Sequence, residues 1–219
     1  MSKWILSLLC WPLLAATPVI VSQSVGQVGD RVVTSREVQI SAAIDQALFP
    51  QKDKANNFRE LHLGDAAMPG EVTAVLLEVV VHREADNFSV AKITEEQIVE
   101  SSRKVERTLE SKTYWQNLEV SSAEVKKFVA QKLTAKAFIQ FKTNSMAGVV
   151  SESEALAYYE KNRLKFGELP FTSFKENIKT FLAQQQLEDR TRAWFEIIKR
   201  KYKVRNVLAE NMNNKVGPK

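Results

Sequence analysis

Apolar positions recur at helical spacing along most of the chain. Between residues 71 and 88 they follow the i, i+3, i+4, i+7, i+8 spacing of one helix face, through Val72, Val75, Leu76, Val79 and Val80. Segments 124–143, 154–165 and 174–202 repeat this stripe. The last would form a helix ~40 Å long, too long for one neighbouring helix to cover. The pattern therefore predicts a protein built mainly of α-helices.

The starts of the predicted helices carry a local signal. At five places a Ser or Thr precedes a Glu or Gln by three residues: Thr34–Glu37, Thr94–Gln97, Ser121–Glu124, Ser151–Glu154 and Ser173–Glu176. In such a capping box, each side chain accepts a hydrogen bond from a backbone N–H that the first helical turn leaves unpaired. We expect a helix to begin at each of the five.

The two ends of the patterned region favour strands. Residues 26–33 place apolar side chains on both sides of Gly29-Asp30, which is typical of a small β-hairpin. Residues 203–208 roughly alternate polar and apolar positions, as a half-buried strand does. We expect a mainly α fold with a small N-terminal β-hairpin, and a C-terminal strand that can pair with it.

Two further segments have no clear period. Residues 49–70 form a long stretch of this kind, and loops of such length are usually functional or mobile. Residues 209–219 have lost the apolar pattern, which predicts a flexible, frayed tail.

The N-terminus is typical of a secretory signal peptide. Residues 1–24 contain no acidic side chain, and Lys3 precedes the apolar run Trp4–Val21. Small residues permit a cut after Ser24 or after Ala16. We expect a signal peptide at 1–24 and a periplasmic location for the mature chain.

Two alternatives to a cleaved leader remain open. The 18-residue run Trp4–Val21 is just long enough to span a bilayer and anchor the protein in the inner membrane, although two prolines interrupt it. Cys10 could instead be a lipid-attachment site, although the preceding Leu8-Leu9 lacks the small residues expected there.

Export changes the meaning of the composition. Cys10 is the only cysteine, so its loss with a leader leaves no thiol for disulfides, cysteine nucleophiles or thiolate metal sites. The net charge is +5, and basic residues cluster only at 199–205. Such a cluster can meet nucleic acid or anionic lipid. In an exported chain it favours the last turn of a long helix, where the dipole stabilises cations, so we expect no nucleic-acid partner.

No pattern in the chain indicates catalysis. His62 and His82 lie 20 positions apart without local Cys, Asp or Glu ligands at metal-binding spacing. A Gly-x-Ser-x-Gly elbow and a phosphate-binding Gly-rich loop are both missing from the sequence. We expect a protein without enzymatic activity, catalytic residues, metal or cofactor.

The order of segments resembles a known family. A hairpin whose second arm runs Val32-Val33-Thr34-Ser35-Arg36-Glu37-Val38 precedes the helices. Tyr158-Tyr159-Glu160-Lys161-Asn162 and Pro170-Phe171 follow later, before the long final helix. This order is similar to that of SurA-type periplasmic chaperones and related PpiC/parvulin-type foldases. The resemblance covers nearly the whole chain after the leader, with residues 25–208 as its SurA N-terminal-like helical domain.

The chain departs from this family at one place. A parvulin prolyl-isomerase domain of about 100 residues commonly lies between the Tyr-Tyr-Glu-Lys-Asn helix and the final helix. Here only Gly167-Glu168-Leu169 separates Phe166 from Pro170. The resemblance therefore implies a chaperone core that lacks the isomerase domain.

These expectations converge on a chaperone that binds non-native envelope or outer-membrane proteins in an apolar helical cradle, without ATP. A dedicated assembly partner of one envelope protein and a degenerate isomerase are the alternatives, and membrane proximity remains possible. The candidate client-binding residues are Phe138, Phe141, Met146, Tyr158, Phe166 and Phe171. A second candidate is a lid formed by Phe49, Phe58, Leu61 and Met68. The sequence does not define an oligomeric state.

Overall fold

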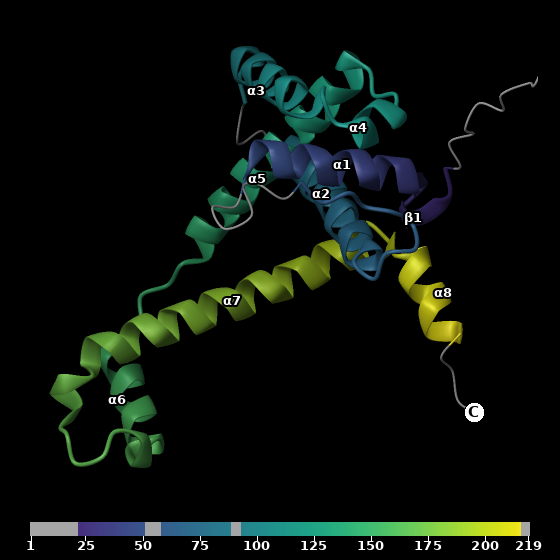
Figure 1. Ribbon diagram of the computed structural model, residues 1–219. Helices are drawn as coiled ribbons and strands as arrows, with labels where there is room; N and C mark the ends of the chain where they lie inside the picture. The colour runs from purple at the N-terminus through teal and green to yellow at the C-terminus, as the bar shows by residue number, and fades with distance from the viewer. Residues whose placement is uncertain (1–21, 51–57, 89–92, 216–219) are drawn as a thin grey trace, which may run out of the picture.

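The computed structural model describes residues 22–50, 58–88 and 93–215, and over these ranges the chain is mainly helical, with one small sheet (Figure 1). The predicted fold class is confirmed. In chain order the elements are β1 (Ser24–Val28), β2 (Arg31–Thr34), α1 (Ser35–Leu48), α2 (Met68–Phe88), α3 (Glu95–Leu109), α4 (Thr113–Asn117), α5 (Ser122–Met146), α6 (Glu152–Lys161), the 3-10 turns η2 (Arg163–Lys165) and η3 (Phe171–Ser173), α7 (Lys175–Lys201), β3 (Val204–Arg205) and α8 (Val207–Lys215).

The expectations for the N-terminus concern residues that are mostly not described. The anchor alternative Trp4–Val21, the cut after Ala16 and the lipid site at Cys10 lie outside the described residues. Within the described ranges, no helix is both long and apolar enough to cross a membrane.

The two ends of the fold meet in one antiparallel sheet with strand order β2-β1-β3. Both the hairpin and its pairing with a C-terminal strand are confirmed. Gly29, at the hairpin turn, has φ +58°, a conformation that side chains with a Cβ rarely adopt. On the other side of β1, Gln27 pairs with Arg205 and Val28 with Val204. The sheet thus joins the first and last elements and closes the body.

The C-terminal strand is shorter than expected, and the chain after it is helical. The predicted strand through Leu208 ends at Arg205, and α8 then runs to Lys215, so the strand bounds and the tail expected at 209–215 are both wrong; residues 216–219 of that tail lie outside the described residues. The cause is Asn206, whose Oδ1 accepts a hydrogen bond from the Ala209 N–H at 2.9 Å, as a helix N-cap does. The Asn206 amide also donates to the Pro69 carbonyl at 2.8 Å, which ties this turn to α2.

Four of the five predicted capping boxes form as expected. The side chains of Thr34, Thr94, Ser121 and Ser151 each accept from the backbone N–H three residues on, and the backbone N–H of each donates in return to the Glu or Gln side chain there. The fifth is wrong. Ser173 ends the η3 turn, and α7 begins after Phe174, which has helical rather than extended backbone angles and makes no side-chain cap. A capping side chain needs an extended N-cap backbone, and the preceding 3-10 turn removes it.

Helix α2 is the centre of the body. It is rich in valine because it is covered on several sides, by the sheet, α5 and α7. Gly26 of β1 lies directly against it, since a Cβ there would be 2.9 Å from Leu76 Cδ1. A second apolar cluster joins α1, α3, α4 and the start of α5. Together the clusters make one body.

The segment 49–70 contributes to this core and is not an open lid over its described part. Leu61 is 3% exposed and Met68 is fully buried. Phe49 and Phe58 are half-buried and pack against the α1–α3–α4–α5 cluster. The lid interpretation is therefore wrong for Leu61 and Met68, which are buried, while Phe49 and Phe58 are partly covered by the core and remain partly open.

Tyr114 of α4 binds the segment around Leu61 to the body through its buried hydroxyl. Its hydroxyl donates to the Leu61 carbonyl at 2.7 Å, and burial raises the pKa of Tyr114 to about 12. An unfolded tyrosine ionises near pH 10. The folded state then binds more protons between pH 10 and 12, so the free energy of unfolding should fall across this window, by up to about 1.4 kcal/mol per pH unit.

Urea unfolding of the wild type and of Tyr114→Phe, measured from pH 8.5 to 12, isolates this contribution. We expect the difference between the two proteins to shrink as the pH rises through the window. A difference that stays constant above pH 10 would contradict the burial of this hydroxyl.

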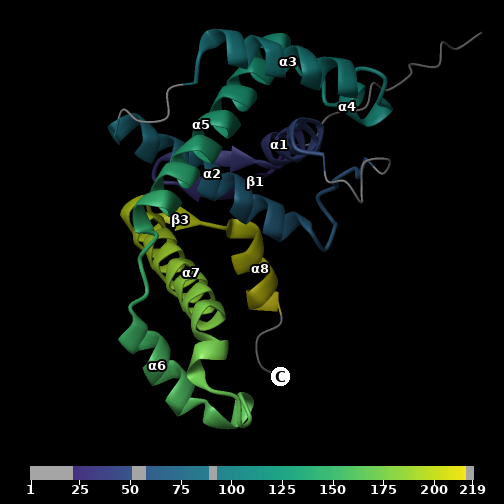
Figure 2. The same ribbon diagram turned by 90° about the vertical axis from the view of Figure 1, so that its left-hand side faces the viewer.

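Helix α7 carries the chain away from the body, as its predicted length required. Its two buried residues, Ile178 and Ile198, are about 20 residues apart, which is ~30 Å along the helix and roughly 200° around it. One end therefore packs on the body and the other end packs its opposite face on α6 (Figures 1 and 2). We call residues 147–190, which comprise the linker to α6, α6, the 3-10 turns and most of α7, the arm.

Candidate binding surface on the arm

The predicted client-binding residues fall into four different environments. Phe138 is fully buried where α5 crosses α2 and α7, with ring centroids 5.7 Å from Phe88 and 6.2 Å from Trp194. It is a core residue, and the expectation that it contacts clients is wrong. The helical period placed it on the apolar stripe but could not show that α7 returns to cover it.

Phe141, one turn after Phe138, is partly open to solvent. Its side chain is exposed at 44%, and its ring stacks on Phe138 at 6.1 Å. Phe88 at the end of α2 is exposed at 54%, and the half-buried Trp194 completes the group. Lys142 Nζ lies 5.9 Å from the Phe88 ring and 5.8 Å from the Trp194 ring. We call Phe88, Phe141 and Trp194 the root patch, because they lie where the arm leaves the body.

Met146 acts in the structure through its backbone. It is the last residue of α5 and is half-buried, and its carbonyl accepts a hydrogen bond from Arg190 Nη1 at 2.8 Å. The same guanidinium lies under Gly148, where a Cβ would be 2.9 Å from Nη1. Arg190 therefore fastens the start of the linker to α7 and sets the position of α6.

The remaining three candidates meet at the far end of the arm. Tyr158, Phe166 and Phe171 are brought together there, and all three are half-buried. They form a small core with their neighbours Tyr159, Phe174, Ile178 and Leu182. The Tyr159 hydroxyl donates to the Leu169 carbonyl at 2.6 Å and closes the turn between η2 and η3. This core holds the end of the arm in shape, so only its outer rim is open to a partner.

The most exposed apolar side chains of the arm were not among the predicted binding residues. Leu164 is fully exposed, Val149 is 97% exposed and Leu169 is 56% exposed, while Leu156 and Phe181 are exposed at 39% and 49%. We call these five residues the arm set. Leu164 lies between Arg163 and Lys165, outside any apolar stripe. That position was a usable signal, since a leucine between two cations is unsuited to a core.

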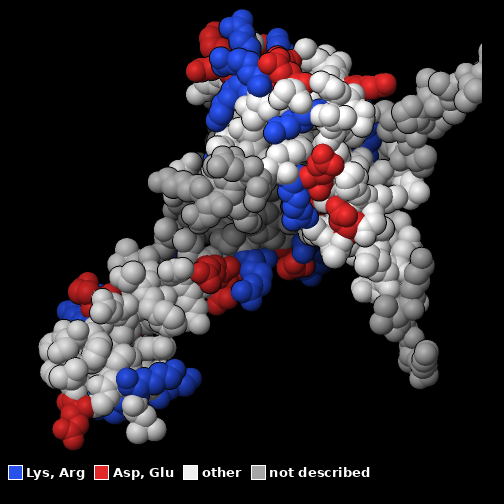
Figure 3. Space-filling model, viewed as in Figure 1, with Lys and Arg blue, Asp and Glu red and all other residues white. Residues whose placement is uncertain are grey.

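Charged residues of both signs surround these apolar side chains. Figure 3 shows acidic and basic groups interspersed over this face of the body and along the arm. On the arm, Lys175 pairs with Glu152, and the pKa of that carboxyl is lowered by this hydrogen bond and charge. The arm is thus an apolar surface in a mixed-charge setting, without a field of one sign.

The basic cluster at 199–205 is largely neutralised by neighbours. Lys199, Arg200 and Lys201 form the last turn of α7, as the dipole argument predicted. Lys199 pairs with Glu196, Lys201 with the buried Glu84, and Arg205 with Glu210. Burial raises the pKa of Glu84, but hydrogen bonds from Lys201 and Tyr202, with the charges of Lys201 and Lys142, outweigh it and the pKa is lowered. Of these cations, Lys201 ties the body end of α7 to α2.

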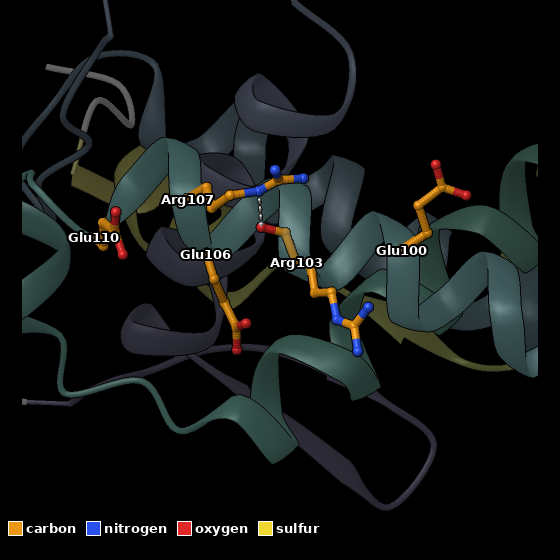
Figure 4. Close-up of a pocket in the computed structure, with 5 residues that line it drawn as sticks. All are labelled: Glu100, Arg103, Glu106, Arg107 and Glu110. Carbon is orange, nitrogen blue, oxygen red and sulfur yellow. Dashed lines mark hydrogen bonds between the residues drawn. The ribbon is translucent and has the colours of Figure 1, made fainter.

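A pocket on the outer face of α3 has a different character. Its volume is about 440 Å³, and five charged side chains of one helix line it: Glu100, Arg103, Glu106, Arg107 and Glu110 (Figure 4). Arg107 Nε donates to the Arg103 carbonyl of the preceding turn at 3.2 Å. Because the side chains point outward from a single helix, the arrangement is that of a solvated charged face, with no converging catalytic groups.

The two histidines lie in separate surroundings. His62 is 3.5 Å from Glu60, and His82 is 3.3 Å from Asp86 one turn further along α2. Within the described part of the chain, no three His, Cys, Asp or Glu side chains gather in a geometry that could hold a metal ion.

Comparison of the chain with protein-family models, with curated proteins and with solved structures found no match.

Proposed function

We propose that this protein is an ATP-independent chaperone of the bacterial periplasm that holds non-native envelope proteins, including outer-membrane proteins, through the exposed apolar side chains of its arm. It uses no cofactor and catalyses no reaction. The order of its segments resembles that of the SurA-type chaperone core, and the signal-like N-terminus supports export.

The placement of exposed apolar side chains is the observation that carries this proposal. Among the described residues, ten large apolar side chains are exposed: Val32, Phe88, Phe141, Val149, Leu156, Leu164, Leu169, Phe181, Ile197 and Met212. Five of them form the arm set, and Phe88, Phe141 and Ile197 lie at or beside the root patch. Single exposed apolar residues are ordinary, but their concentration on one projecting element marks an interaction surface.

The energetics of such a surface fit reversible holding. Burying one leucine or phenylalanine side chain completely contributes about 1.5–3 kcal/mol. A client segment that covers part of each exposed side chain gains a fraction of this free energy at every contact. The conformational entropy that the client loses on binding offsets part of the gain. Several weak contacts together would bind an unfolded chain, and each can be released without ATP.

The shape of the molecule gives the client access. Figure 1 shows the arm leaving the body on one side and α8 on the other, and Figure 2 shows α6 at the far end of α7, away from the body. Because α7 is continuous over 27 residues, the arm keeps its apolar surface apart from the body. The interspersed charges keep a complex with an apolar client in solution.

Aggregation assays with two matched variants test the proposal. The arm variant carries Val149→Ser, Leu164→Ser and Leu169→Ser, at side chains exposed by more than half. The control carries Val32→Thr and Met212→Gln, at half-exposed positions of β2 and α8. All of these sites are exposed, so both variants should unfold at the wild-type urea concentration.

We expect the wild type and the control to suppress aggregation of several unrelated denatured proteins, and the arm variant to be at least about fivefold less effective, as a loss of ~1 kcal/mol of binding requires. Suppression by all three proteins alike would contradict the arm as the binding surface. Suppressed aggregation of only one denatured protein would favour a dedicated assembly partner. Faster proline isomerisation in a model peptide would contradict the proposal that the protein catalyses no reaction.

A further inference from the structure

The residues just before the hairpin belong to the folded body. The Gln23 backbone N–H donates to Ser35 Oγ at 3.0 Å, and the Ser35 N–H donates back to the Gln23 carbonyl at 2.8 Å. Ser35 is 2% exposed at the start of α1. Ser24 then pairs with Thr34 as the first residue of β1. Gln23 therefore satisfies the polar groups of a buried serine, and the strand starts one residue before the expected domain boundary.

A cut after Ser24, which the small residues of the sequence permit, would damage this arrangement. Hydrolysis adds water across the Ser24–Val25 peptide bond, leaving a carboxylate on the leader and an ammonium group on Val25. Val25 is 2% exposed while Ser24 before it is exposed, so the new ammonium group would replace a neutral peptide N–H at the edge of the core. The N–H and hydroxyl of Ser35 would lose Gln23 at the same time.

We propose that the export leader is cleaved on the N-terminal side of Gln23, so that Gln23 and Ser24 stay in the mature protein as part of its sheet. This inference rests on the proposed export of the chain. The processing enzyme is a leader peptidase that uses water as the only co-reactant. A cut after Ala16 leaves Gln23 and Ser24 in the mature chain, and a cut after Ser24 removes both.

Two chains with different starts test the structural part without export. One begins at Ser22 and keeps every described residue, and the other begins at Val25. We expect the melting temperature of the chain that begins at Val25 to be lower by roughly 5 °C or more, from the two lost hydrogen bonds to Ser35 and the lost pairing of Ser24. A chain that fails to fold from Val25 supports the inference as well. Equal melting temperatures would overturn it.

The mature N-terminus of the full-length protein, recovered after expression in a bacterium and read by intact mass, tests the processing part. A mass that includes Gln23 but lacks Met1 supports both export and the inference. A mature chain that begins at Val25 would leave export standing and overturn the inference. A chain that retains Met1 would contradict cleavage, while the two engineered starts still decide the role of Gln23.

Discussion

Replacing Phe138 by alanine should lower the free energy of unfolding by about 3–5 kcal/mol, the usual loss for a buried phenylalanine. Phe138 has no solvent exposure, and its ring contacts side chains from α2, α5 and α7. Removing it takes apolar area out of the core and leaves a cavity at the root of the arm. Urea unfolding followed by circular dichroism measures the loss.

Phe141→Ala is the matched control for this prediction. The two phenylalanines lie one turn apart on the same helix, but Phe141 is exposed at 44%. We expect Phe141→Ala to cost at most about 1.5 kcal/mol, because much of its ring is already in water. Equal losses for the two variants would show that the root of the arm is packed differently from the structure described above.

The second large effect is expected at Lys132 on α5. Its side chain is 6% exposed and forms an ion pair with Glu78 of α2 at 2.7 Å, and Asp45 of α1 lies 3.4 Å away. Gln131 also donates to Glu78, at 2.7 Å. Lys132→Met should destabilise the protein by about 3–5 kcal/mol, because it leaves a carboxylate in the interior without its cation. Urea unfolding near neutral pH measures this change.

A double variant separates the lost pair from lost packing. Glu78→Met in the Lys132→Met background removes the isolated carboxylate and fills its place with an apolar side chain of similar size. We expect the double variant to be at least about 1 kcal/mol more stable than Lys132→Met alone, since apolar replacements of buried pairs are often neutral. A double variant less stable than Lys132→Met would contradict the account of Lys132 as the partner of a buried charge.

Features set by neighbouring residues could be predicted from the sequence, and features set by distant contacts could not. The capping boxes at Thr34, Thr94, Ser121 and Ser151 depend on four consecutive residues, so the pattern alone was sufficient. The box at Ser173 failed because the preceding turn had already fixed its backbone. Asn206 is also a local cap, and reading it as one would have predicted α8.

The candidate site shows the limit of periodicity more clearly. Phe138 and Phe141 belong to the same apolar stripe, and nothing in α5 itself decides that one is buried and the other open. Phe138 is buried because Trp194 packs against it, and Trp194 is in place only because α7 returns to the body some 50 residues later. Leu164 was missed because it belongs to no period, and its place between two cations was the one local signal of its exposure.

Covalent capture of a client at single positions tests the central claim most directly. A photo-crosslinking amino acid is placed at Leu164, which is fully exposed on the arm, or at Val32, which is 49% exposed on the body. Each protein is irradiated with a denatured outer-membrane protein, and adducts are counted by gel and mass spectrometry. The account predicts adducts from position 164 and few from position 32. Equal adducts from both positions, or adducts only from position 32, would contradict the proposal that the arm holds the client.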